Sequence, residues 1–111
     1  MERDKVLLTL RANAESLRKQ FFVRSLALFG SVARGQARSP GDVDLLVEFD
    51  RPIGLLHLVG TAQQLEKLLG VEKVDLVLRW SVLPELREAI FAEAIDVFDG
   101  KTVETTNTAH A

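Results

Sequence analysis

The sequence predicts a small mixed α/β (α+β) domain, in which a mixed sheet carries helices packed on one face. Apolar residues recur at helical spacing in the first 21 residues and again over 54–69. Short apolar runs over 25–29, 43–49 and 74–78 have the length of buried strands, with glycine, proline or charged residues between them. Strands that are separated by helices favour a sheet covered by helices over an all-helical or all-strand fold.

The opening segment predicts one amphipathic helix. Its apolar residues follow a 3-4-3-4 spacing, and charged residues occupy the other faces of the same helix; the apolar positions are Leu7, Leu10, Ala14, Leu17 and Phe21. The strand over 25–29 then leads into Gly30-Ser31 and a short helix. Residues 38–41 predict a turn before the strand 43–49, which the break at 50–52 ends.

The second half of the chain continues the alternation. A helix is predicted over 54–69, with Gly70 in the stop position and an apolar face made of Leu55, Leu58, Ala62, Leu65 and Leu69. After the strand 74–78, Pro84 suits the first turn of a helix that runs to about residue 94, with Ser81 as a possible cap.

The end of the chain predicts a small edge strand over 95–98 and then a tail. Residues 101–111 are polar and unpatterned, so we expect one domain over 1–100 followed by a disordered segment.

Composition excludes several classes of protein. The 111 residues are 47% apolar and 27% charged, as in a globular domain, and the net charge of −2 comes without a basic block, so direct duplex nucleic-acid binding is not expected. The absence of cysteine excludes disulfides and thiolate catalysis. No apolar segment approaches the roughly 20 residues that span a bilayer, and the first residues do not form a signal peptide, so we expect no membrane association and a cytoplasmic location.

Two aspartates at the start of the strand 43–49 are candidate metal ligands. Asp42 and Asp44 stand at positions i and i+2, so their side chains point to the same face of a strand. Neighbouring carboxylates disfavour each other's ionisation, and a hard divalent cation such as Mg²⁺ or Mn²⁺ relieves that conflict. The alternative is a pair of surface aspartates at a strand start.

The Gly30-Ser31 pair upstream is a candidate phosphate site. A glycine between a strand and a short helix lets backbone N–H groups and a hydroxyl face outward, where a phosphate can bind. Ser31 can equally be a helix cap. Arg34 either pairs with a triphosphate oxygen or braces a nearby acid.

In these residues the chain resembles the nucleotidyltransferase superfamily of DNA polymerase beta. More narrowly, it resembles the minimal nucleotidyltransferase (MNT) proteins of bacteria and archaea, whose pattern is a strand, Gly-Ser, a short helix, Asp-x-Asp and a third Asp on a later strand. Asp75 matches the third carboxylate, and the resemblance runs from about Leu26 to Phe98. Gly41 stands where the family often has Ser. The resemblance implies a polymerase beta-like nucleotidyltransferase palm.

The resemblance also implies a chemistry. Asp42, Asp44 and Asp75 would hold the metals that grip the phosphates of a nucleoside triphosphate, and Asp75 would help to deprotonate the attacking hydroxyl. Ser31 would bind the β- or γ-phosphate. The implied reaction is in-line attack on the α-phosphorus with departure of pyrophosphate.

MNT proteins typically pair with a HEPN-domain ribonuclease toxin, which they neutralise by transferring AMP from ATP to a tyrosine. The resemblance therefore implies an antitoxin enzyme in a hetero-oligomer with that toxin. A binding-only antitoxin or regulatory subunit with a vestigial site, and transfer to a small molecule, stay open as alternatives.

Four further residues are weaker candidates. Glu48 would share the face of Asp44. Arg79 and Trp80, which follow the Asp75 strand, could reach a nucleotide or a partner, although a tryptophan in such a position more often covers the sheet edge. His57 lies within an apolar helix face, which favours a packed or partner-facing histidine over a ligand.

Overall fold

The computed structural model describes residues 2–36 and 42–100; the turn predicted over 38–41 and the tail predicted over 101–111 lie outside this part of the chain. The described elements are, in order, α1 (Arg3–Ala12), α2 (Ala14–Phe21), β1 (Val23–Phe29), α3 (Gly30–Ala33), β2 (Asp42–Phe49), α4 (Leu55–Leu69), β3 (Lys73–Leu78), the 3₁₀ helix η1 (Arg79–Ser81), α5 (Pro84–Glu93) and β4 (Ile95–Asp99).

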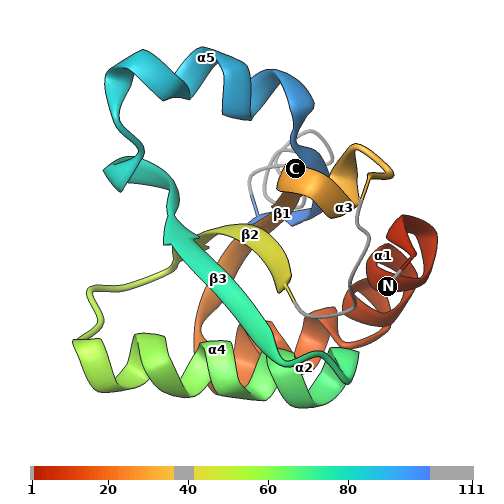
Figure 1. The fold of residues 1–111 in the computed structure, drawn as a ribbon. Helices are drawn as coiled ribbons and strands as arrows, with labels where there is room; N and C mark the ends of the chain where they lie inside the picture. Colours follow the sequence, from red (N-terminus) through yellow and green to blue (C-terminus); the bar gives the residue numbers. More distant parts are fainter. Residues whose placement is uncertain (1, 37–41, 101–111) are drawn as a thin grey trace, which may run out of the picture.

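The four strands form one mixed sheet in the order β3-β2-β1-β4 (Figure 1). β1 runs antiparallel to both β2 and β4, whereas β2 and β3 are parallel. The mixed sheet and the edge position of β4 confirm the sequence prediction. β3 forms the other edge, so Asp75 lies on an edge strand.

The opening segment forms two helices rather than the single helix that its periodicity predicts. The break lies at Asn13, whose side-chain amide donates a hydrogen bond to the Thr9 carbonyl at 2.8 Å. An asparagine that bonds to nearby backbone in this way competes with helix continuation. Leu10 and Leu17, on either side of the break, are nevertheless both buried, as their spacing predicts.

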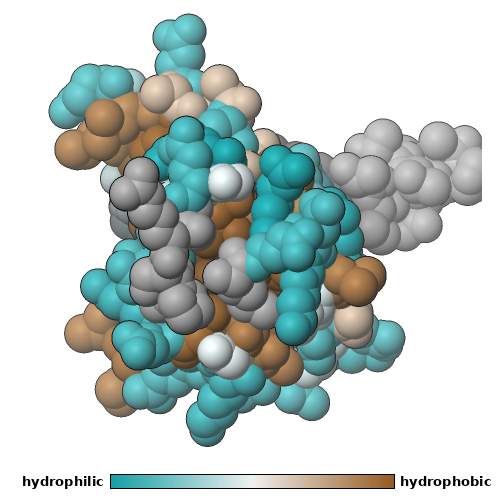
Figure 2. All heavy atoms as spheres, turned by 45° about the vertical axis from the view of Figure 1, so that its right-hand side comes forward, coloured by the Kyte–Doolittle hydropathy of each residue, from teal (hydrophilic) through white to brown (hydrophobic). Residues whose placement is uncertain are grey.

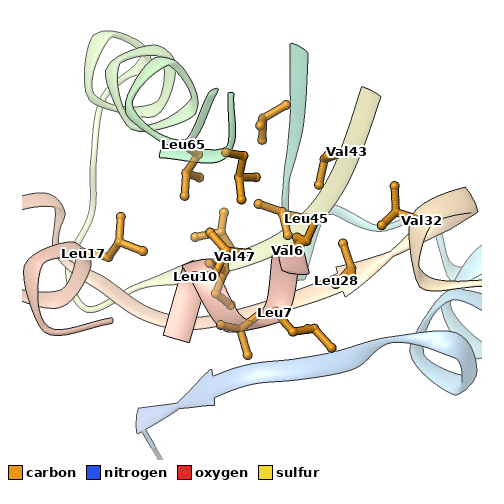
Figure 3. Packing of buried hydrophobic residues seen from close by; sticks show 14 of the residues in the cluster. Val6, Leu7, Leu10, Leu17, Leu28, Val32, Val43, Leu45, Val47 and Leu65 are labelled. Carbon is orange, nitrogen blue, oxygen red and sulfur yellow. The ribbon is translucent and has the colours of Figure 1, made fainter. Parts of the chain in front are cut away.

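The main core lies between the sheet and the helices α1, α2 and α4 (Figure 3). Val43, Leu45 and Val47 alternate along β2 and point into this core, where they pack with Leu10 of α1 and Leu65 of α4. The period of two therefore turns Asp42 and Asp44 toward the opposite face of the sheet.

That opposite face is partly covered by α5, which lies on the other side of the strands from α4 in Figure 1. Ile90 and Phe91 of α5 pack against a smaller buried group that includes Ala27 and Leu46. Three helices thus lie on one face as predicted, and α5 is an addition on the other.

Helix α4 begins after Gly54 and ends at Gly70, whose positive φ of 67° forms the stop that the sequence predicts. Its buried stripe differs from the predicted face, because Thr61 is fully buried while Leu55 is 73% exposed. Thr61 tolerates burial since its hydroxyl donates to the His57 carbonyl at 2.8 Å.

Helix α5 has Pro84 in its first turn, which confirms the predicted start. Ser81 is not its cap; the Ser81 hydroxyl instead donates to the Leu78 carbonyl at 2.8 Å and closes η1. The residue at the N-cap position is Leu83, which makes no side-chain capping bond.

Candidate active site

The strand register brings the predicted site residues to one end of the sheet. Phe29, the last residue of β1, is opposite Asp44 in the antiparallel ladder, so the Gly30 turn follows directly beside Asp44. In the parallel ladder Asp44 is opposite Asp75. The carboxyl end of β1 therefore meets the amino ends of β2 and β3, and Gly30, Asp44 and Asp75 lie together there.

Asp44 and Asp75 form a carboxylate pair. Burial raises the pKa of Asp44 above its ordinary value, and Asp75 raises the pKa further through repulsion and a side-chain hydrogen bond. The negative charge of Asp42 adds to the rise, whereas the Arg34 guanidinium opposes it. The pair thus holds more negative charge than the nearby groups offset, which is the condition that a divalent cation relieves.

Asp42 lies on the same face of β2 but is exposed, and its negative charge contributes to the raised pKa of Asp44. Among residues 2–36 and 42–100, no three Asp, Glu, His or Cys side chains gather closely enough to hold a metal ion. Lys73 also stands near the pair, with its Nζ 3.3 Å from Asp75 Oδ1. Two carboxylates still fit Mg²⁺, which commonly takes one or two of them together with phosphate oxygens. The role of Asp42 as a ligand stays a prediction.

Gly30 is required where it stands. Its φ of 78° lies in the left-handed region, and a Cβ built at this position would overlap the Asp44 carboxylate. The neighbouring Ser31 hydroxyl makes no hydrogen bond within the described part of the chain and caps no helix there. Both features keep the turn open beside the carboxylate pair.

Glu93, the last residue of α5, is the residue of this site that the sequence reasoning missed. Its Oε1 accepts the Gly30 backbone N–H at 3.1 Å, and its Oε2 accepts from Arg34 Nη1 at 2.9 Å. Arg34 therefore braces an acid, which is one of its two expected roles; its contact with a triphosphate stays a prediction. These bonds hold the pKa of Glu93 below its ordinary value, with the Arg34 bond as the largest cause.

The weaker candidates lie elsewhere. The Glu48 carboxylate accepts a hydrogen bond from the Ser25 hydroxyl at 2.8 Å, near the carboxyl end of β2. His57 is packed, as expected: its Nε2 lies 2.6 Å from the Phe21 carbonyl, so this nitrogen carries the proton. Arg79 lies over the Phe91 ring.

Trp80 is 76% exposed and lines a cavity of about 350 Å³ with residues that include Phe49, Ile53 and Leu78. This cavity is at the carboxyl ends of β2 and β3, opposite the end where Asp44 and Asp75 meet. It is therefore separate from the carboxylate pair.

The site thus combines paired carboxylates and a glycine turn with the Ser31 hydroxyl and the Arg34 guanidinium. This combination is suited to phosphoryl or nucleotidyl transfer. The carboxylates suit a divalent cation, and the hydroxyl and guanidinium suit phosphate oxygens.

Comparison with known proteins identifies the class. A family model described as a nucleotidyltransferase domain matches residues 10–97. The protein adenylyltransferase MntA of Thermococcus cleftensis is 38% identical over 88 residues, which cover 79% of this chain and 88% of that protein. A structure described as a minimal nucleotidyltransferase matches with a TM-score of 0.68 at 41% identity, covering 86% of this chain and 95% of that one. The chain therefore belongs to the nucleotidyltransferase domain family, and it is an enzyme of that class.

A more distant structure shares the fold. It contains a tri-AMPylated HEPN toxin of Shewanella oneidensis in complex with an MNT antitoxin, and it matches with a TM-score of 0.61 at 18% identity, covering 90% of this chain and 78% of that chain. The family match and the minimal nucleotidyltransferase structure confirm the predicted fold class, a polymerase beta-like palm. Within the described residues, no helix has both the length and the apolar character needed to cross a membrane.

Proposed function

We propose that this protein is an antitoxin that transfers AMP from ATP to a tyrosine hydroxyl of a partner HEPN ribonuclease toxin, with Mg²⁺ or Mn²⁺ as cofactor. The observation that carries the proposal is the meeting of the Asp44–Asp75 pair with the Gly30-Ser31 turn. The relatives support the acceptor, because one is named a protein adenylyltransferase and another was solved with an AMPylated HEPN toxin.

In this proposal Asp44 and Asp75 hold the cation, with Asp42 as a third ligand from the same face of β2. A bound divalent cation supplies positive charge that stabilises the attacking and leaving oxygens of the displacement. The raised pKa of Asp44 supports this assignment, since removal of negative charge from the pair is favourable.

The tyrosine oxygen attacks the α-phosphorus of ATP, and the bond from that phosphorus to the β-phosphate oxygen breaks. Asp75 takes the tyrosine proton, and pyrophosphate leaves. The products are a tyrosine–AMP phosphodiester and pyrophosphate.

The Gly30 turn positions the triphosphate. The Ser31 hydroxyl donates to a β- or γ-phosphate oxygen, and the missing Cβ of Gly30 leaves room for the Asp44 carboxylate beside the nucleotide. Arg34 is 46% exposed and keeps N–H groups beyond its bond to Glu93, which can reach a phosphate oxygen.

This chain has exposed apolar side chains to which the partner can bind. Exposed apolar side chains gather on η1 and α5, namely Trp80, Leu83 and Leu86, and on the first turns of α4, namely Leu55, Leu56 and Val59. In Figure 2 brown side chains are exposed at the height where α5 lies in Figure 1. Apolar side chains at the centre of a contact are typical of stable complexes. We expect a hetero-oligomer with the toxin, in the cytoplasm.

Two observations favour a second function, a binding-only antitoxin. Lys73 Nζ lies 3.3 Å from Asp75 and supplies a positive charge where a cation would bind, and Asp42 stands apart from the pair. A protein of this kind would silence the toxin by association alone.

Mass spectrometry of the toxin separates the two functions. The proposed HEPN partner is incubated with ATP, Mg²⁺ and either the wild type or Asp75→Asn, and its ribonuclease activity is assayed in parallel. We expect the wild type to add the mass of one AMP or a small multiple and to suppress the ribonuclease. Asp75→Asn should bind the toxin without modifying it.

An unmodified toxin that both proteins silence equally would support the binding-only function. A toxin that neither protein modifies nor silences would contradict both functions and direct the search to small-molecule acceptors. Asp96→Asn, a change at an exposed acid of β4 outside the proposed partner surface, is the control that should act as wild type.

A further inference from the structure

One carboxylate on α5 joins two parts of the nucleotide-binding turn. Glu93 accepts the Gly30 backbone N–H with one oxygen and the Arg34 guanidinium with the other, at 3.1 and 2.9 Å. The side chain of Glu93 is 26% exposed, against 46% for Arg34. Glu93 therefore bridges the first residue of α3 and the residue that follows this helix.

The sheet explains why Glu93 reaches the turn. Leu28 of β1 is opposite Ile95 of β4, so the chain entering β4 passes the carboxyl end of β1. Glu93 lies two residues before Ile95, and Gly30 lies two residues after Leu28. The antiparallel ladder thus places the end of α5 beside the turn.

Glu93 occupies only part of the donor capacity of Arg34. The Nη1 atom bonds to Glu93, and the Nε atom donates to Gln36 Oε1 at 3.0 Å. Hydrogen bonds from two of its three nitrogens fix the plane of the guanidinium, while its Nη2 makes no hydrogen bond within residues 2–36 and 42–100. In this position the positive charge of Arg34 acts to lower the pKa of Asp44, against the larger effects that raise it.

We propose that Glu93 is a positioning residue for nucleotide binding: its carboxylate sets the Gly30 turn and the plane of Arg34, so that the Ser31 hydroxyl and the Arg34 Nη2 face the triphosphate. The inference rests on the proposed function, because it assumes that ATP binds beside Asp44. It assigns to α5 a role in the site that does not involve contact with substrate.

The test measures nucleotide binding without turnover. Calorimetry with Mg²⁺ and an ATP analogue that has a methylene group between its α- and β-phosphorus gives the Kd of the wild type, Glu93→Ala, Glu93→Gln, Arg34→Ala and the double variant. Thermal melting of each variant monitors folding. Glu88→Ala is the matched control, because Glu88 is an exposed acid of the same helix.

We expect Glu93→Ala to raise the Kd about tenfold, as the loss of a charged hydrogen bond typically does. Glu93→Gln should raise it less, since an amide oxygen can still accept the Gly30 N–H. In the Arg34→Ala background, Glu93→Ala should raise the Kd by clearly less than it does in the wild type, because part of its action passes through Arg34. Glu88→Ala should bind as wild type.

A folded Glu93→Ala that binds the analogue as well as wild type would overturn the inference. So would tighter binding, which would show that Glu93 competes with phosphate for Gly30 and Arg34. The inference would also be contradicted if Glu93→Ala raised the Kd by the same factor in the wild type and in Arg34→Ala. A Glu93→Gln variant that binds as weakly as Glu93→Ala would contradict it as well. A wild type that binds no analogue would instead contradict the proposed function, and the inference would fail with it.

Discussion

Gly30 shows how a single position can set the geometry of a site. Its backbone needs a positive φ, and its missing side chain leaves the space that the Asp44 carboxylate fills. Gly35, five residues later, has a similar φ of 70°, but a Cβ built there would meet nothing within 4 Å. Comparison of the two positions therefore distinguishes the cost of a positive φ from the cost of a clash between a Cβ and the Asp44 carboxylate.

Gly30→Ala should destabilise the protein more than Gly35→Ala and should weaken nucleotide binding. Gly35→Ala introduces only the left-handed backbone cost of about 1–2 kcal/mol, whereas Gly30→Ala also displaces Asp44. Urea unfolding and binding of the ATP analogue test this. Equal effects of both substitutions on binding would contradict the account of the turn.

Asp44→Asn should raise the unfolding midpoint at pH 7 in EDTA. The folded state raises the pKa of Asp44 above the ordinary 3.8, so ionised Asp44 destabilises the fold. The native state binds the proton more tightly than the unfolded chain, so stability from protonated Asp44 is complete below pH 3.8 and is lost as pH rises through the raised pKa. The advantage of Asp44→Asn should therefore be largest above that pKa and disappear as the pH falls below 3.8.

Urea titrations across pH, without divalent metal, measure this difference. Asp96→Asn, at an exposed position of β4, is the control and should show no comparable gain. A loss of stability in Asp44→Asn at pH 7 in EDTA would show that the carboxylate is well paired in the fold.

A shared face for Asp42 and Asp44 could be predicted because the alternation along one strand is local in sequence. Asp75 lies on a different strand and was assigned through the family resemblance; the parallel pairing of β2 with β3 places it opposite Asp44, whereas Asp42 forms no close group with the two. Glu93 could not be predicted, because its partner Gly30 is 63 residues away and a single glutamate before a short strand carries no pattern. Its role depends on the antiparallel pairing of β1 with β4, which local sequence does not specify.

Helices and strands, too, could be predicted where their signals are local in sequence. The strands and their order along the chain agree with the apolar runs, and α4 and α5 begin where Gly54 and Pro84 predict. The break between α1 and α2 was missed because the apolar spacing continues across it. Asn13 ends the helix through its own side chain, and both halves still bury their leucines in the same core.

The connection between α2 and α4 depends on His57. Its Nε2 donates to the carbonyl of Phe21 at the end of α2, and its ring stacks on Phe22, with ring centroids 5.3 Å apart. His57→Leu leaves that carbonyl without its partner and should cost about 1–3 kcal/mol in the free energy of unfolding. Binding of the ATP analogue should be unchanged, since α4 packs on the face opposite Asp44.

Chemical denaturation together with calorimetry checks both parts of this prediction. Thr61→Val, which removes another buried hydrogen bond of α4, is a matched control and should likewise leave binding unchanged. A His57→Leu variant that is stable but cannot bind the analogue would place His57 in the site after all.

At the scale of the whole molecule, folding and binding are linked. A metal–nucleotide complex that binds only the native state stabilises it, by about 2.7 kcal/mol at a ligand concentration 100 times the Kd. The melting temperature should therefore rise with Mg²⁺ and the analogue together. Asp42→Asn combined with Asp44→Asn should remain folded and lose this rise; a double variant that keeps the full response would contradict the metal assignment.

The most direct test of nucleotidyl transfer follows the α-phosphorus itself. Purified protein, Mg²⁺ and the proposed HEPN partner are incubated with ATP labelled at either the α- or the γ-phosphate, and protein-bound label is counted for the wild type and Asp44→Asn. We expect the wild type to transfer the α-label and not the γ-label to the HEPN protein, and Asp44→Asn to transfer neither. Transfer of the γ-label, or equal transfer of the α-label by both proteins, would contradict the proposed function.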